Sequence, residues 1–239
     1  PGYTPLDNSV VLDTGDIELI IRRFVDAARR AAEAGFDLIE IHGAHGYLIS
    51  EFISPLFNRR TDEYGGSFEN MMRFPLEIIR GVRRVVGPDM PLSFRCSVEE
   101  FLSGGMTLPL ACRIAPAVVE AGVNLFNVST GLAETSEFTG PPPAIPRGWN
   151  ADRSAAIKEA LHGSAVVAVA GRVVDVETAE SILAAGKADM VAMGRALIAD
   201  PDLPRKAAEK KEAFIRPCIS CSEGCSGQPQ LTCALNPGV

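Results

Sequence analysis

The sequence has no excess of basic residues and no long apolar run. Its 239 residues include 23 Lys and Arg against 30 Asp and Glu, a formal net charge of −7 at pH 7. With no basic block to offset it, this acidic balance argues against a nucleic-acid or membrane-surface binder. The longest apolar runs, such as 164–170, are far shorter than the roughly 18 residues that a membrane-spanning helix requires. We therefore expect a cytoplasmic protein without nucleic-acid or membrane partners, and leave self-association into a homo-oligomer open.

The sequence also lacks the Gly-x-Gly-x-x-Gly pattern of a dinucleotide-binding Rossmann fold. It has instead a repeated unit of helix end, glycine and short apolar strand, in which the glycine suits the left-handed backbone that ends many helices. The unit recurs at Gly35, Gly87, Gly122, Gly163 and Gly186. The expected strands are 38–41, 91–96, 125–128, 165–170 and 190–193. Strand and helix thus alternate five times, which predicts a parallel sheet covered by helices.

Polar side chains lie at or just beyond the carboxyl end of every expected strand. They are Glu40, His42, Arg95, Asn127, Ser129, Arg172 and Arg195. A (β/α)8 TIM barrel builds its site from many strand ends at once, whereas an open sheet uses one switch point. The sequence therefore favours an α/β fold of the (β/α)8 TIM barrel type. Because five strands cannot close that barrel, we expect this chain to carry about its last five β/α units, with the first three strands lying before Pro1.

The last two strands each lead into a Gly-Arg pair, Gly171-Arg172 and Gly194-Arg195. Loops after strands seven and eight of TIM barrels often bind phosphate, because glycine lets backbone N–H groups approach the anion. The arginines could add charge-assisted hydrogen bonds. The alternative is that the glycines simply end the strands and the arginines lie on the rim.

Two of the three histidines follow the first expected strand, in the segment His42-Gly-Ala-His45-Gly-Tyr47. Neutral imidazoles can donate hydrogen bonds to one substrate oxygen, and a tyrosine can supply a proton. A zinc site would need a third ligand, and none has convincing spacing. The histidines could instead satisfy buried backbone groups, but their clustering at a strand end favours a functional site.

Four of the six cysteines lie beyond residue 217, spaced Cys218-x2-Cys221-x3-Cys225-x7-Cys233. Four thiolates at such spacing suit Zn²⁺ or an iron–sulfur cluster, and spacing alone does not separate the two. Disulfides are a third option, which an enzyme-like body of this size does not favour. The other two, Cys96 and Cys112, are expected in the core.

Three segments of the chain carry a family pattern: HGAHGYLISEFISP at 42–55, NRRTDEYGGSFEN at 58–70 followed by Arg73-Phe74, and ADMVAMGRALIADP at 188–201. Together they resemble the old yellow enzyme (NADH:flavin oxidoreductase) family of FMN-dependent ene-reductases. The resemblance covers nearly the whole chain from Asp16. The cysteine tail, with RPCISCSEGC at 216–225 and CALNP at 233–237, resembles the [4Fe-4S] loop of the family's iron–sulfur branch. That branch includes 2,4-dienoyl-CoA reductase, 2-enoate reductase and trimethylamine dehydrogenase. In that branch electrons pass from NAD(P)H through FAD and a [4Fe-4S] cluster to FMN.

The resemblance implies a role for each candidate residue. His42 and His45 match the pair that polarises the substrate carbonyl, and Tyr47 matches the acid that protonates the substrate after hydride transfer. Arg95 matches the arginine beside the flavin N1/O2 edge. Arg172, Gly194 and Arg195 match the residues of the FMN phosphate site. The two Gly-Arg loops described above, which also include Gly171, predict a phosphate site at the same place. The tail cysteines match the cluster ligands, although the gap before Cys233 is shorter than the family usually has.

The implied reaction is reduction of a C=C bond conjugated to a carbonyl or thioester, in a small unsaturated carbonyl compound or acyl-CoA. Trimethylamine dehydrogenase differs at the first histidine and at the tyrosine, so the set found here favours alkene reduction over amine dehydrogenation or demethylation. The loop 130–136 lacks the further histidine of the dienoyl-CoA reductases, which puts dienoyl-CoA itself in doubt. A flavin-free fragment that binds only metal or a partner is the alternative outside enzymology.

We divide the chain into a connecting segment (1–15), a partial FMN-binding barrel (16–210) and a cluster-binding tail (211–239). Both ends look cut, and an FAD domain is expected after residue 239. This stretch alone is therefore not expected to accept electrons from NAD(P)H through FAD. The proline-rich stretch 140–150, which holds the only Trp, could shape the substrate mouth or form a plain surface loop.

Overall fold

Five parallel strands pair in sequence order to form one sheet. The computed structural model describes residues 10–226 and 230–239. The strands are β1 (Ile39–Gly43), β2 (Leu92–Ser97), β3 (Leu125–Ser129), β4 (Val166–Ala170) and β5 (Met190–Ala192). Each strand pairs in parallel with the next along the chain. The predicted parallel α/β sheet is therefore confirmed, with strand ends within about two residues of those expected.

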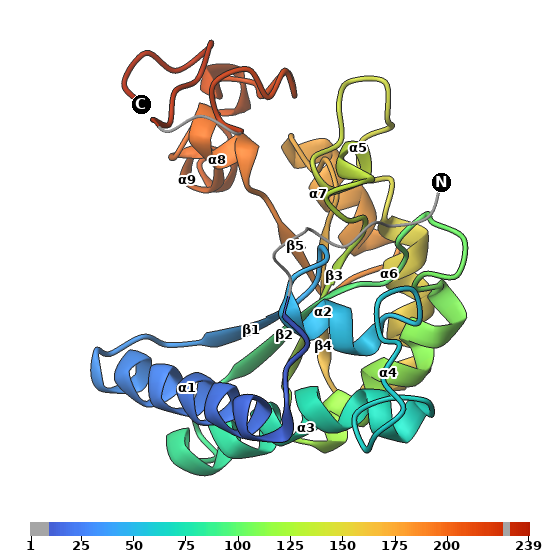
Figure 1. Cartoon of the computed structure of the whole chain (residues 1–239). Coiled ribbons are helices and arrows are strands. Elements are labelled where there is room, and N and C mark those ends of the chain that lie inside the picture. The colour runs from blue at the N-terminus through green and yellow to red at the C-terminus, as the bar shows by residue number, and fades with distance from the viewer. Residues whose placement is uncertain (1–9, 227–229) are drawn as a thin grey trace.

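Helices connect the strands and cover the sheet (Figure 1). They are α1 (Thr14–Glu33), α2 (Leu48–Ile53), α3 (Phe68–Val86), α4 (Leu108–Glu120), α5 (Ser136–Thr139), α6 (Ala151–Leu161), α7 (Val176–Ala184), α8 (Arg195–Ala199), α9 (Leu203–Ala208) and the 3₁₀ helix Glu212–Phe214. Figure 1 shows α1 and α3 side by side at one end of the molecule, with the cysteine tail beyond α8 and α9 at the other. No described helix has both the length and the apolar character needed to cross a bilayer.

Ser67, Thr107, Asp152 and Asp175 have side chains of the kind that cap helices, and the sequence predicts each of them at the start of a helix. Ser67 and Asp175 accept hydrogen bonds from backbone N–H groups in the first turns of α3 and α7, as expected. Thr107 precedes α4 but makes no capping hydrogen bond through its side chain. The prediction that Asp152 caps a helix is wrong, because α6 begins after Asn150 and Asp152 already lies in its first turn. All five predicted helix-ending glycines adopt positive φ, for example +82° at Gly87.

The core lies between the sheet and the helices. Its largest fully buried side chains include Phe74 of α3, Phe94 of β2 and Phe126 of β3. Cys96 is fully buried on β2, as expected, and Cys112 is half-buried on α4. Burial of this apolar surface is what holds the curved sheet and its helices together.

The segment 58–70, which carried part of the family resemblance, forms a hydrogen-bonded loop between α2 and α3. Asn58 Nδ2 donates to the carbonyls of Phe52 and Tyr64, at 2.7 and 2.8 Å. Asn70 Nδ2 donates to the carbonyl of Gly65 at 2.9 Å. A Cβ at Gly65 would lie 2.4 Å from the carbonyl oxygen of Arg60, so glycine is needed there. These residues hold the backbone of the loop.

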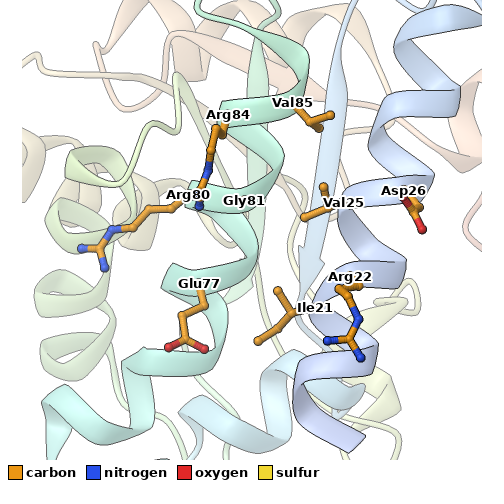
Figure 2. Close-up of a pocket in the computed structure, with 9 residues that line it drawn as sticks. All are labelled: Ile21, Arg22, Val25, Asp26, Glu77, Arg80, Gly81, Arg84 and Val85. Atoms are coloured by element: carbon orange, nitrogen blue, oxygen red, sulfur yellow. The ribbon is translucent and has the colours of Figure 1, made fainter. Parts of the chain in front are cut away.

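A groove of about 650 Å³ runs between α1 and α3 on the outer helical layer. Figure 2 shows that the two helices line it with apolar and charged side chains, among them Val25, Arg80 and Arg84. The carboxyl ends of the strands, where the candidate site residues lie, do not contribute to it. The candidate site residues therefore lie outside this groove, at the strand ends.

Candidate functional site

The strand-end loops bring all five predicted flavin-site residues to one pocket of about 150 Å³. They are Arg95, Gly171, Arg172, Gly194 and Arg195. Arg95 comes from β2, and the two Gly-Arg pairs follow β4 and β5, so three strands meet at this pocket. A Cβ placed on Gly194 would meet no atom within 4 Å, which leaves its backbone open to a ligand.

Arg95 is a partly buried cation with an unused donor. Its Nη2 donates to Ser129 Oγ at 3.4 Å, a long contact. Its Nε is buried and has no hydrogen-bond partner among the described residues. A buried donor without a partner is costly, so this arrangement suits a ligand that brings an acceptor. The residues of the pocket thus fit an anionic group held by the loops and a polar ring edge held by Arg95.

The two predicted histidines and the tyrosine lie together beside Arg95. The ring centroid of His42 is 5.1 Å from that of His45 and 5.3 Å from that of Tyr47. His45 Nε2 lies 2.7 Å from Ser129 Oγ, the hydroxyl that also receives the Arg95 contact. Tyr47 directly precedes α2 and is 64% exposed, so its phenol is accessible to a substrate.

Both histidines are held neutral. Burial, followed by the nearby Arg95 charge, lowers the pKa of His42 and lowers that of His45 to about 3. Each imidazole therefore has one N–H to donate at neutral pH. Neutral donors that converge beside a cation can polarise a carbonyl oxygen.

This titration predicts an acid-sensitive fold. An unfolded histidine takes up a proton below about pH 6.5, whereas folded His45 stays neutral until about pH 3. The unfolded state therefore binds more protons over this range, and stability falls as the pH drops through it. We expect His45→Gln to remove up to about 2 kcal/mol of the stability lost between pH 7 and pH 5. Urea unfolding at both pH values measures this difference. An unchanged difference would mean that His45 is not held neutral.

A second polar layer lies deeper in the sheet. Glu40 Oε2 on β1 accepts hydrogen bonds from Ser93 Oγ on β2 and from Asn127 Nδ2 on β3, both at 2.8 Å. Asn127 Oδ1 is buried without a partner among the described residues. The sequence singled out Glu40, Asn127 and Ser129 as strand-end polar residues but gave them no role. Their shared face follows from the two-residue alternation of side chains along a strand.

The guanidinium groups of the two Gly-Arg pairs extend to the cysteine tail. Arg172 Nε donates to Ser220 Oγ at 3.2 Å, and Arg195 Nη1 donates to Ser222 Oγ at 2.8 Å. These two serines directly flank Cys221 in the sequence. The sequence does not mark these serines, because nothing in the residue spacing indicates that the strand-end arginines reach the tail.

All four tail cysteines line one small cavity beside Arg195. The segments that contain Cys225 and Cys233, the two limbs of the tail, are joined by a hydrogen bond from the Thr232 N–H to the Gly224 carbonyl at 2.9 Å. Gly224 directly precedes Cys225, and Thr232 directly precedes Cys233. Among the described residues, no group of three or more His, Cys, Asp or Glu side chains is arranged to hold a metal ion. The thiols thus share a cavity without converging, although as a donor set they have the four sulfurs that a [4Fe-4S] cluster needs.

The chain belongs to the NADH:flavin oxidoreductase / NADH oxidase family, whose model matches residues 6–213. It is 48% identical to NADH oxidase of Thermoanaerobacter brockii over 231 residues (95% of this chain, 35% of that protein). It is 35% identical to cinnamate reductase of Clostridium sporogenes over 245 residues (95% and 36%). It is also 36% identical to dimethylamine dehydrogenase of Hyphomicrobium sp. over 224 residues (93% and 30%).

Among solved structures, a 2-naphthoyl-CoA reductase–2-naphthoyl-CoA complex matches with a TM-score of 0.86 and 32% identity, over 93% of this chain and 34% of that one. The structural neighbours are TIM barrels of the old yellow enzyme family, so the chain is a partial (β/α)8 barrel and that expectation is confirmed. The chain spans about a third of the length of the curated relatives named above. The family is one of flavin oxidoreductases that use NADH.

Proposed function

We propose that the chain is the FMN-binding part of an FMN- and [4Fe-4S]-dependent ene-reductase, with electrons ultimately from NAD(P)H. Its substrate is a C=C bond conjugated to a carbonyl or thioester in a small molecule or acyl-CoA. The main support is the placement of two neutral imidazoles and a tyrosine beside Arg95, which also lines the pocket of the two Gly-Arg pairs. Cinnamate reductase and the naphthoyl-CoA reductase, by their names, are reductases of conjugated compounds.

In this proposal the strand-end loops hold the cofactor. Backbone N–H groups at Gly171 and Gly194 and the nearby guanidiniums bind the FMN phosphate, and Arg95 Nε donates to the ring edge. Bound FMN would supply a hydride for the β-carbon of the alkene. The boundaries 16–210 for the barrel and 211–239 for the tail, and an FAD domain after residue 239, belong to the same proposal.

The side chains beside the pocket act on the substrate. His42 and His45 donate hydrogen bonds to its carbonyl oxygen, which draws electron density from the conjugated alkene. Tyr47 delivers a proton to the carbon next to the carbonyl, so hydride and proton together saturate the bond. The exposed position of Tyr47 at the start of α2 is compatible with this role.

The tail cysteines Cys218, Cys221, Cys225 and Cys233 are the proposed cluster ligands. Pairing of Thr232 with Gly224 supports Cys233 as the fourth ligand despite the short gap, because it brings the residue before Cys233 against the residue before Cys225. A Cβ on Gly224 would lie 2.1 Å from Thr232 Oγ1, so the two limbs touch here. When bound, the cluster carries electrons one at a time.

A substrate panel tests the proposed reaction. The full-length protein that contains this chain should oxidise NAD(P)H with enoates, enones or enoyl thioesters, and should be reduced at least about tenfold more slowly by methylamines. Rapid reduction of the flavin by methylamines with no turnover of any conjugated alkene would instead assign the site to amine dehydrogenation, as in the dimethylamine dehydrogenase relative.

A further inference from the structure

Each arginine of the two Gly-Arg pairs joins three separate segments of the chain. Arg195 donates to Ser222 Oγ in the tail and, through Nη2, to the Pro141 carbonyl at 2.9 Å. Arg172 donates to Ser220 Oγ in the tail and, through Nη1, to the Ile145 carbonyl. The strand-end loops, the proline-rich stretch 140–150 and the tail are therefore held by two guanidiniums.

Arg195 also borders three cavities at once. It lines the pocket of about 150 Å³ with Arg95, the small cavity of the four cysteines, and an open cleft of about 660 Å³. The cleft lies between the residues around α5 and the tail, and Cys221 lines both it and the cysteine cavity. A movement of the Arg195 side chain would therefore change the walls of both proposed cofactor sites.

The backbone at these contacts is in a conformation that few residues adopt. Arg172, Ser220 and Ser222 have φ values of +52°, +59° and +56°, in the left-handed region that glycine favours. Residues other than glycine remain in this region where the surrounding contacts hold them. Here the arginine–serine hydrogen bonds are such contacts, and they fix the tail on both sides of Cys221.

We propose that Arg172 and Arg195 couple the two cofactor sites, so that FMN binding and the order of the cysteine tail reinforce each other. This rests on the proposed function, which supplies the two ligands. A guanidinium keeps its charge and has several donors in a rigid plane, so one group can serve a phosphate and a serine together. When the tail serine fixes the guanidinium, the phosphate meets a preorganised cation, and a coupling of this kind acts equally in both directions.

The serines allow this coupling to be tested without altering either cofactor's ligands. Neither Ser220 nor Ser222 lines the phosphate pocket, so an effect on FMN must pass through the arginines. In the full-length protein with both cofactors bound, we expect Ser222→Ala to raise the FMN dissociation constant about three- to tenfold. Loss of iron to a chelator should accelerate by a similar factor, and the Ser220→Ala/Ser222→Ala double variant should show larger changes.

Ser226→Ala is the matched control, because Ser226 lines the same open cleft but makes no hydrogen bond to either arginine among the described residues. It should leave both quantities unchanged. If Ser222→Ala loses iron faster but binds FMN as the parent does, or changes neither, the coupling is wrong and the proposed function stands. If the parent protein holds neither iron nor FMN, the proposed function itself is wrong.

Discussion

Replacing Tyr47 by phenylalanine is expected to slow flavin reoxidation by the alkene about 10²- to 10⁴-fold, the usual contribution of a positioned general acid. Reduction of the flavin should be unaffected, because no proton reaches the substrate in that half of the cycle. Stopped-flow absorbance measures the two half-reactions separately. The Tyr47 ring lies beside that of His42, but the residue is largely exposed. Loss of its hydroxyl should therefore leave the fold intact.

Tyr64→Phe is the matched control for this substitution. Tyr64 is buried, its hydroxyl donates to Glu77 Oε2 at 3.2 Å, and it does not line the strand-end pocket. Its variant should keep both half-reactions within about twofold of the parent, the range usual away from a site. Equal slowing of both half-reactions in Tyr47→Phe would show that the tyrosine supports flavin binding rather than proton delivery.

Replacing Cys221 by serine is expected to separate the electron supply from the chemistry at the alkene. A hydroxyl is a poor substitute for a thiolate as a ligand. Loss of a residue that only hydrogen-bonds to a metal ligand usually lowers metal affinity by about 10- to 100-fold, so loss of a ligand itself should lower the affinity for the cluster by at least about 100-fold. NAD(P)H-driven turnover should then be lost. With excess FMN present, chemically reduced flavin should still be reoxidised by the alkene, because His42, His45 and Tyr47 are unchanged.

Cys112→Ser provides the matched control, since this thiol is half-buried on α4 and lies outside the cysteine cavity. It should keep its iron and its NAD(P)H-driven turnover. Full turnover with NAD(P)H in an iron-free Cys221→Ser protein would show that electrons do not pass through the tail.

The sequence was sufficient for the sheet because local rules govern it. Glycines that end helices, followed by short apolar runs, located all five strands. The limits of the strands were less certain, as β1 extends to Gly43 by pairing with Cys96 although Gly43 is not apolar. Pro75 and Pro116 lie inside α3 and α4, where packing of the helix outweighs the missing hydrogen bond.

Tertiary contacts account for what the sequence did not indicate. Glu100 is fully buried and accepts hydrogen bonds from Ser54 Oγ and Met106 N, and burial raises its pKa. No periodic pattern marks an acidic residue in a loop as buried. Similarly, spacing placed Arg172 and Arg195 at the strand ends, but their direction toward the tail depends on contacts between distant segments.

The proposed flavin and cluster sites lie together in this chain. Their most direct test is the visible spectrum of the full-length protein, purified without oxygen, with flavin, iron and zinc quantified in the same sample. We expect about one FMN and about four iron atoms per chain in this region, and little zinc. Absence of flavin together with full zinc occupancy of the tail would contradict the account.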